Sequence, residues 1–540
     1  MSLDDTTMVF TPQAEDGGNT RPKPTLSNVS SRSVFIEETI PRPDPSRKHR
    51  TLALCFDGTR DEFDEDNSNV VNFFRMLRKD SPEDQMVYYQ AGIGTYTMAH
   101  IRGPLKEKWY KVQDAMLGVH LDNHVMGGYT FLMQNYRVGD KISLFGFSRG
   151  AYTVRVLASM LSKVGLLPKD NHEQIPFAYR MFSREDDNGW LQSQEFKKAF
   201  SIDVHIDFIG LWDTVGSIGF IPKYFQALST HVHHVRHALA LDERRVRFEP
   251  TFFTLPTEDE FRSGLNWGEK HEHEHEHEKS ESPISDSDKE GKYGSEEGIA
   301  ATVKQDDAET HDTLAGEKCN EDVACHYDRG AIDLEEVWFA GCHSDVGGGS
   351  VTNDTRNSLA RISLRWMVRE CFKANTGILF RKDSFRNVGL DYTMLWPEVK
   401  ERPPPVLDFI CGKKPAQKRR VVNGALEDNL DFVNEEEEDL ADALSPKNDM
   451  LSLVNSPWWW ILELIPHRIR CPAKDDNDSW TRKFSINRKR GRFIPQQTKG
   501  VKIHRTVEIR MKKEDHRERN GKNYVPRATL RDKKYWVTID

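Results

Sequence analysis

The sequence predicts an α/β fold in which a mostly parallel sheet carries helices on both faces. Short apolar runs closed by turn residues, typical of buried strands, alternate with segments whose apolar residues recur three and four positions apart, typical of amphipathic helices. This alternation favours parallel pairing, because each crossover helix returns the chain to the same edge of the sheet. The predicted strands are 51–56, 85–89, 141–147, 204–212 and 336–340.

Each element has its own local signal. The first strand, TLALCF, is closed by the turn residues Asp57-Gly58-Thr59, and the second ends in AGIG. Apolar spacing over about 111–137 predicts one helix or two joined helices. The strand that ends at Phe147 leads into a helix over 149–164, and a further helix is expected over 358–376.

Polar segments of low complexity interrupt this pattern. Residues 1–48 lack periodicity and are expected to be disordered, and 268–328, which contains HEHEHEHE, is expected to be a flexible insertion. The main α/β domain is then predicted over 49–375. A C-terminal region over 376–540 follows, with an acidic disordered stretch at 412–448 that includes NEEEED.

Composition excludes several classes of protein. The net charge is −9, so no basic excess points to nucleic acid. No run reaches the ~18–20 apolar residues that a transmembrane helix needs, and no basic and apolar leader is visible at the start. The seven cysteines are odd in number and scattered, which favours a reducing compartment. A cytoplasmic protein without a transmembrane segment is therefore expected.

The motif that carries chemistry is Gly146-Phe147-Ser148-Arg149-Gly150, a G-x-S-x-G between a predicted strand and a predicted helix. This is the setting of the nucleophile in an α/β-hydrolase, where a tight strand-to-helix turn lifts the serine hydroxyl above the sheet. The two glycines remove side chains that would clash as helix and strand cross. Ser148 is therefore the predicted nucleophile. The alternative is a serine in an ordinary turn of a nucleotide-binding fold.

A serine nucleophile needs a base, and the base needs an acid that orients it. In this fold the chain order is serine, acid, histidine, each after a strand. Asp213 follows the strand 204–212 in GLWDTVG, and His343 follows the strand near 340 in GCHSDVGGG. Asp345 is a second carboxylate close to His343 that could support or replace Asp213. No metal or cofactor is required, although metal-dependent hydrolysis through these side chains and Asp57 is a further alternative.

The oxyanion of an acyl-transfer reaction needs backbone N–H donors. The N–H of Arg149, at the start of the predicted helix, is the first candidate, and that of Gly58 or Thr59 after the first strand is the second. Asp57 in this turn is expected to support the site from behind. A strand that ends in D-x-D-G-T would mark phosphatases with an aspartate nucleophile, but Cys55 occupies the place of that nucleophile.

Several blocks together resemble the α/β-hydrolase family that includes the phospholipase catalytic domain of type VI secretion lipase effectors. The blocks are FDGT (56–59), GFSRG (146–150), GLWDTVG (210–216), HALALDERR (237–245), WFAGCHSDVGGG (338–349) and IHRTVEIR (503–510). The resemblance implies a Ser148–Asp213–His343 triad and hydrolysis of an ester, with phospholipids as the substrate of the effector members. The chain resembles an intracellular eukaryotic member, because it lacks an obvious membrane-binding module and carries acidic insertions.

Weaker features leave alternatives open. Trp458, Trp459 and Trp460 precede basic residues, and could form a membrane contact, an acyl-binding lid or part of the core. His504, in the last block, is the alternative base. The alternating histidines of HEHEHEHE could bind a metal, but a solvated linker is the preferred interpretation. The four histidines between 231 and 237 do not have the spacing of metal ligands. The function alternatives are a lipase, esterase or thioesterase on one side and an inactive scaffold of the same fold on the other.

Overall fold

A computed structural model describes most of the chain and leaves several segments undescribed. The described residues are 38–43, 46, 49–59, 61–92, 121–184, 186–216, 231–253, 332–409, 418–419, 421–422, 425–426, 432–451, 459–472, 480–487, 489–494, 500–513, 523–528 and 536–540. The predictions for residues 1–37, the predicted helix before 121, the insertion at 268–328 with its HEHEHEHE run, and Trp458 lie outside them.

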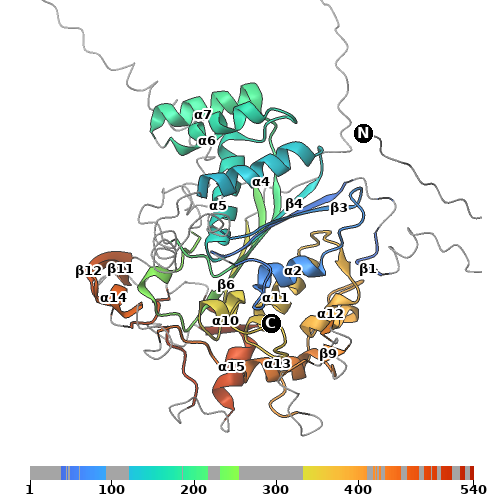
Figure 1. Ribbon diagram of the computed structural model, residues 1–540, viewed down its shortest axis with the longest axis vertical. Helices are drawn as coiled ribbons and strands as arrows, with labels where there is room; N and C mark the ends of the chain where they lie inside the picture. The colour runs from blue at the N-terminus through green and yellow to red at the C-terminus, as the bar shows by residue number, and fades with distance from the viewer. Residues whose placement is uncertain are drawn as a thin grey trace, which may run out of the picture.

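An eight-stranded sheet organises the molecule, in the order β14-β13-β7-β6-β5-β4-β2-β3, and every neighbouring pair is parallel (Figure 1). Its strands are β2 (Thr51–Phe56), β3 (Gln85–Gln90), β4 (Lys141–Phe147), β5 (Ile206–Trp212), β6 (Val232–Ala240), β7 (Asp333–Phe339), β13 (Val501–His504) and β14 (Trp536–Ile539). The predicted α/β fold with a mostly parallel sheet is confirmed. The predicted strands are present with ends shifted by at most a few residues, and β6 was not predicted as a strand.

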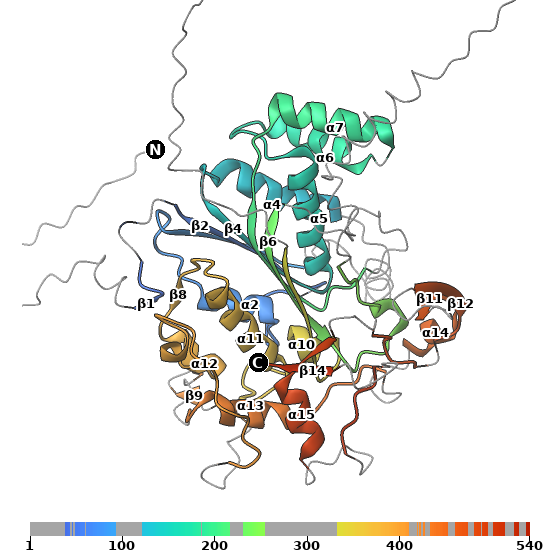
Figure 2. The ribbon, with the colours of Figure 1, turned by 180° about the vertical axis from the view of Figure 1, so that it is seen from behind.

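Helices cover both faces of the sheet, as Figures 1 and 2 show from opposite sides. One face carries α4 (Leu121–Asn135), α5 (Ser148–Val164), α6 (Ile175–Ser183) and α7 (Asp187–Phe200). The other carries α2 (Asn69–Met76), α10 (His343–Gly347), α11 (Ala360–Lys373), α12 (Ser384–Val388), α13 (Glu435–Ala443) and α15 (Arg505–Lys512). Among the described residues, no helix is long and apolar enough to cross a bilayer.

Side chains of the central strands alternate between two cores, because successive residues of a strand point to opposite faces. In β2, Leu52 and Leu54 enter the core beneath α4 and α5, whereas Ala53 and Cys55 enter the core beneath α2 and α11. Both cores are filled by fully buried aliphatic and aromatic side chains. Strands buried on both faces explain why the sequence shows continuous apolar runs in place of a polar–apolar alternation.

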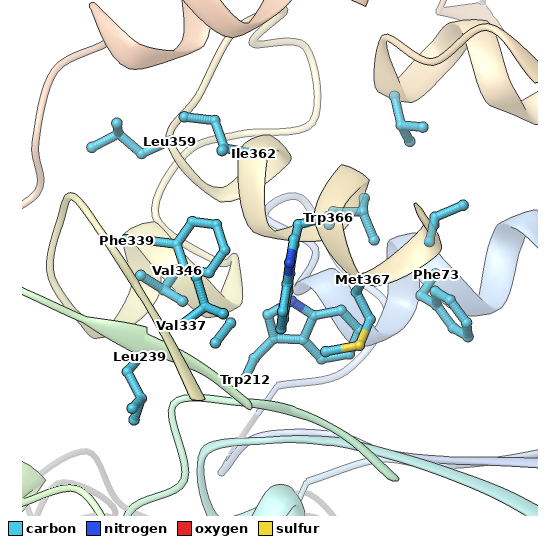
Figure 3. Packing of buried hydrophobic residues seen from close by; sticks show 14 of the residues in the cluster. Phe73, Trp212, Leu239, Val337, Phe339, Val346, Leu359, Ile362, Trp366 and Met367 are labelled. Atoms are coloured by element: carbon cyan, nitrogen blue, oxygen red, sulfur yellow. The ribbon is translucent and has the colours of Figure 1, made fainter. Parts of the chain in front are cut away.

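The core beneath α2 and α11 fixes the end of β5. The ring of Trp212 is fully buried and lies between the sheet and α11, together with Trp366 and Met367 (Figure 3). The ring of Phe73 on α2 meets Trp212 edge to face at 6.1 Å between ring centroids. Because aromatic side chains pack with defined geometry, this core holds the backbone from which the next residue, Asp213, projects.

The C-terminal region contributes to the same sheet. The predicted boundary at 375 therefore does not coincide with the end of the α/β core, because β13 pairs with β7 and β14 pairs with β13. Each of these strands has only four residues, too few for a clear signal in the sequence. The rest of the region forms β11 (His467–Pro472), which pairs antiparallel with β12 (Trp480–Ser485), and α14 (Trp459–Leu464).

Two segments predicted to be disordered contain ordered structure. Within 1–48, the strand β1 (Thr39–Ile40) pairs with β8 (Phe380–Arg381), and both of its residues are buried. Within 412–448, the helix α13 is buried along its whole length. Short strands β9 (Val421–Val422) and β10 (Ala425–Leu426) also form there. The acidic residues of α13 are ordered because arginines of α11 and Arg402 pair with them.

Candidate active site

Ser148 begins helix α5 directly after strand β4, in the predicted strand-to-helix turn. Its backbone φ is +57°, in the left-handed region that residues other than glycine rarely adopt. A Cβ at Gly150 would lie 2.3 Å from the carbonyl oxygens of Phe56 and Asp57, and one at Gly146 would lie 2.7 Å from the backbone of Ala151. Gly150 therefore allows the turn to pass close to the end of strand β2, and Gly146 allows the first turn of α5 to lie close to strand β4.

His343 lies between Ser148 and Asp213. Its Nε2 is 2.8 Å from Ser148 Oγ, and its Nδ1 is 2.6 Å from Asp213 Oδ2. Asp213 directly follows β5, and His343 is the first residue of α10 after β7. All three side chains are buried. The structure thus brings together the three residues that the sequence singled out, in the hydrogen-bonding order of a nucleophile, a base and an orienting acid.

Burial and charge act in opposite directions on this arrangement. Burial lowers the pKa of His343, while the hydrogen bond and the negative charge of Asp213 raise it; the net shift is downward. Burial would raise the pKa of Asp213, but the guanidinium of Arg492 and the His343 hydrogen bond hold it well below its usual range. The imidazole is therefore neutral and the carboxylate ionised near pH 7, which are the states that general-base catalysis needs.

The imidazole is enclosed by aromatic rings and an ion pair. The rings of Phe147 and Phe248 lie 4.7 and 4.8 Å from it between centroids. The carboxylate of Glu243 accepts the backbone N–H of His343 at 3.2 Å and pairs with Arg245 at 2.9 Å. Burial would raise the pKa of Glu243, but the guanidinium groups of Arg245 and Arg492 lower it to about 2. These contacts fix the position of His343.

The oxyanion candidates are Arg149, next to Ser148, and the loop after β2, whose Asp57 carbonyl oxygen would lie 2.3 Å from a Cβ at Gly150. Arg149 is buried in the first turn of α5, so its N–H is at the positive end of the helix. The Gly58 N–H donates to Asp57 Oδ1 at 2.8 Å. Because that donor already has a partner, Thr59 is the stronger second candidate in this loop.

Asp57 contacts its own loop and the neighbouring strand β3. Its carboxylate accepts the Tyr89 hydroxyl at 2.8 Å and the neighbouring N–H of Gly58. Burial raises its pKa to about 6, against the hydrogen bonds, which lower it. Asp61 lies close enough for its charge to act on the same loop, and burial also raises its pKa.

The other candidate residues have different surroundings. Asp345 accepts the backbone N–H groups of Cys342 and Asn448 at 2.9 and 3.0 Å, so it caps α10, while Asp213 bonds the imidazole. His504 stacks on Phe339 and bonds Thr506 at the start of α15. The structure therefore places His343, and not His504, beside Ser148.

The structure also gives the surroundings of Trp460 and of the four histidines between 231 and 237. The half-buried ring of Trp460 lies under the ammonium of Lys489 at 4.0 Å. The four histidines between 231 and 237 each pair with a carboxylate: His231 with Asp203, His233 with Asp207, His234 with Asp333, and His237 with Glu336. Within the described ranges, no group of three or more His, Cys, Asp or Glu side chains is arranged to hold a metal.

The sequence did not single out Glu243, Arg245 or Arg492. The first two lie in the loop after β6, within the block HALALDERR, and polar residues directly after a parallel strand are a signal for a site. Arg492 lies in the basic run RKRGRF, and no motif marks it.

Comparison with known proteins identifies the family. The model for the Tle1-like phospholipase effector catalytic domain of type VI secretion systems matches residues 50–370, more than half of the chain. The chain belongs to this family. The Tle1-like match includes Ser148, Asp213 and His343 but ends before Arg492.

The relatives extend beyond bacteria. The uncharacterized protein YEL023C of Saccharomyces cerevisiae is 29% identical over 566 residues, which cover 86% of this chain and 80% of the yeast protein. This match is consistent with the predicted eukaryotic membership.

Two solved structures are similar to parts of the chain. An uncharacterized protein from Pseudomonas aeruginosa matches 61% of this chain with 14% identity and a TM-score of 0.29. The Tle1 effector bound to the VgrG spike of the type 6 secretion system matches 38% with 16% identity and a TM-score of 0.22. The chain spans less than half of either of these proteins, 46% and 48%.

Proposed function

We propose that this protein is a serine hydrolase that cleaves carboxylic esters through Ser148, His343 and Asp213. The observation that carries the proposal is the position of one imidazole, within hydrogen-bonding distance of both Ser148 Oγ and Asp213 Oδ2. Membership of the Tle1-like family supports ester hydrolysis and makes the acyl esters of phospholipids the leading substrate class.

In the proposed reaction, Ser148 Oγ attacks the acyl carbonyl carbon while His343 Nε2 takes the hydroxyl proton. The negative charge on the carbonyl oxygen is stabilised by the backbone N–H groups of Arg149 and Thr59. Collapse of this intermediate breaks the ester bond, and His343 returns the proton to the leaving alcohol. A water molecule, deprotonated by the same imidazole, then releases the acid from Ser148. Asp213 orients the imidazole and stabilises its cationic form.

The first test is labelling with a fluorophosphonate probe, which reacts with activated serines. The wild type is expected to take the label and Ser148→Ala to lose it. Ser159→Ala is a matched control, because Ser159 lies on the same helix and bonds only a backbone carbonyl of its own helix among the described contacts. Labelling that survives in Ser148→Ala would refute the assignment, and an unlabelled wild type would favour the scaffold alternative.

The substrate class needs a second measurement. Hydrolysis of acyl esters of increasing chain length and of a phospholipid panel is expected to favour long chains or phospholipids. Preference for short, water-soluble esters would instead indicate an esterase. The cytoplasmic location stays a prediction, to be tested by fractionation of cells, and so does a membrane contact through the tryptophan run.

A further inference from the structure

A C-terminal arginine reaches the site from outside the family match. Arg492 Nη1 lies 2.5 Å from Asp213 Oδ1, and Arg492 Nη2 lies 2.8 Å from Asp213 Oδ2, although the two residues are 279 positions apart. The side chain of Arg492 is 4% exposed and that of Asp213 is not exposed at all. A planar guanidinium that meets both oxygens of a carboxylate fixes its orientation as well as its charge.

Each oxygen of Asp213 has two partners. Oδ1 accepts from Arg492 Nη1 and from the backbone N–H of Ala240, at 2.5 and 2.9 Å. Oδ2 is shared between Arg492 Nη2 and His343 Nδ1, at 2.8 and 2.6 Å. The imidazole therefore bonds a carboxylate oxygen that a cation also holds. This sharing reduces the attraction that Asp213 exerts on a protonated His343.

Arg492 is itself held in place by the loops around the site. Its guanidinium donates to the carbonyl oxygens of Ala240 and Phe248 at 3.0 and 2.7 Å. At its neighbour Gly491, a Cβ would lie 1.9 Å from the carbonyl oxygen of Arg527, so only glycine allows this close passage of the chain. Ile494 on the same segment is buried in the core.

A second contact fixes the segment that carries Arg492. The Asn487 side chain donates to the carbonyl oxygen of Arg244 and to Glu463, each at 2.7 Å, and Glu463 accepts the N–H of Val246 at 2.7 Å. The segment is thus attached to the loop that carries Glu243 and Arg245.

We infer that Arg492 is a positioning residue of the active site, which orients the Asp213 carboxylate and, by sharing its charge, keeps His343 a weaker base than an unshared aspartate would make it. The inference rests on the proposed function for its catalytic meaning. It implies that the C-terminal region completes the site, so a chain cut after the family match would keep the triad candidates but lack the arginine that positions Asp213. Among the described residues, the other charged groups that act most strongly on His343 are Glu243 and Arg245, which pair with each other.

The test compares three variants. Arg492→Met removes both the positive charge and the paired hydrogen bonds to the two oxygens of Asp213. Arg492→Lys keeps the charge but loses the planar group that bonds both oxygens. Arg510→Met is the matched control, because Arg510 is an equally buried arginine of the C-terminal region that donates to the carbonyl oxygens of Ala443 and Ser445. Its loss should lower the unfolding temperature without moving the pKa of His343.

The first readout does not need turnover. The pKa of His343 is followed by NMR of ¹³Cε1-labelled histidines, with the signal assigned by its absence in His343→Ala. Arg492→Met is expected to raise this pKa by about one unit or more, because Asp213 then acts on His343 alone. Arg492→Lys and Arg510→Met should leave it near the wild-type value. An unchanged or lowered pKa in a folded Arg492→Met protein would overturn the inference.

The second readout is kcat/KM for an ester as a function of pH. Arg492→Met should move the acid limb to higher pH, and both Arg492 variants should lower the plateau roughly 10-fold or more, because the carboxylate loses its fixed orientation. If Arg492→Met does not fold, a plateau in Arg492→Lys equal to that of the wild type would overturn the inference. A wild type without label or turnover, whose His343 still responds to Arg492, would instead refute the proposed function alone.

Discussion

The imidazole of His343 lies 2.8 Å from the hydroxyl of Ser148, although the two residues are 195 positions apart. They meet because parallel strands deliver their following loops to one edge of the sheet. Ser148 follows β4, and His343 follows β7, with β5 and β6 between these strands. Asp213, after β5, approaches the imidazole from its other nitrogen.

The first prediction concerns this hydrogen-bonded chain. Asp213→Asn is expected to lower kcat on the order of 10⁴-fold while the fold is retained, because an amide does not hold the imidazole in the tautomer that presents Nε2 as an acceptor. Ser148→Ala and His343→Ala are each expected to lower kcat by about 10⁶-fold, and the double variant by no more. Steady-state kinetics on an acyl ester measure this. If the double variant lost kcat by the product of the two single losses, Ser148 and His343 would not act as one catalytic unit.

The second prediction concerns pH. Because burial lowers the pKa of His343 from 6.5, the acid limb of kcat/KM should have its midpoint below pH 6.5. The enzyme is active when the imidazole is neutral, so activity rises with pH through this midpoint and is lost below it. A pH profile on a neutral ester measures the midpoint. A midpoint above pH 7 would contradict the assignment of the acid limb to His343.

Asp57 provides the control for that profile. Burial raises its pKa to about 6, so its titration falls in the same range. Asp57→Asn removes this titration and keeps an oxygen that can accept the Gly58 N–H. The acid limb should remain in this variant if His343 causes it. If the acid limb disappeared in Asp57→Asn, the titration of Asp57 and not of His343 would be its cause.

The third prediction concerns stability. Burial raises the pKa of Asp345 from 3.8 to about 7, so the fold favours its protonated form. The resulting stability is complete below about pH 4 and is lost as pH rises to about 7, by at most about 4 kcal/mol, since each pKa unit corresponds to ~1.4 kcal/mol. Asp345→Asn keeps an acceptor for the N–H groups of Cys342 and Asn448 and should lack this loss.

The measurement for Asp345 is denaturant unfolding at several pH values between 4.5 and 8. The free energy of unfolding of Asp345→Asn relative to the wild type should increase as pH rises across this range. A difference that does not change with pH would show that the carboxyl group is not protonated in the folded protein.

The positions of the triad candidates could be predicted because each has a local signal. Ser148 lies in a strand–turn–helix motif, and Asp213 and His343 directly follow apolar strands. Arg492 has no such signal: it is one of several basic residues in RKRGRF, and long-range packing determines which of them turns inward. Its partner is fixed only when β5 and the C-terminal segment are folded together.

The acidic helix α13 was missed for a physical reason. A run of carboxylates repels itself, so NEEEED is typical of a disordered segment when it is considered alone. Its partners include Arg361, Arg365 and Arg369, which recur four positions apart on one face of α11. That spacing is visible in the sequence, but the pairing of the two charged faces depends on the tertiary fold.

The last prediction tests how far these buried charges hold α13 to α11. Asp442 accepts from Arg361 Nη1 at 3.0 Å and from Arg365 Nη1 at 2.6 Å, and all three side chains are buried. Loss of Asp442 leaves Arg361 and Arg365 with one carboxylate partner each, Glu438 and Asp439, and breaking a buried ion pair costs about 3–5 kcal/mol. Asp442→Ala is therefore expected to lower the free energy of unfolding by about this amount, as measured by denaturant titration.

A matched surface pair separates burial from charge. Asp383 pairs with Arg381 at 2.6 Å, but both side chains are about half exposed, so water stabilises either charge when its partner is lost. Asp383→Ala should leave the unfolding midpoint nearly unchanged, and raised salt should not rescue Asp442→Ala, because screening acts weakly on buried charges. Equal losses in the two variants would show that the network around α13 adds no more than a surface ion pair. In that case the apolar contacts of Leu440 would be what holds the helix in place.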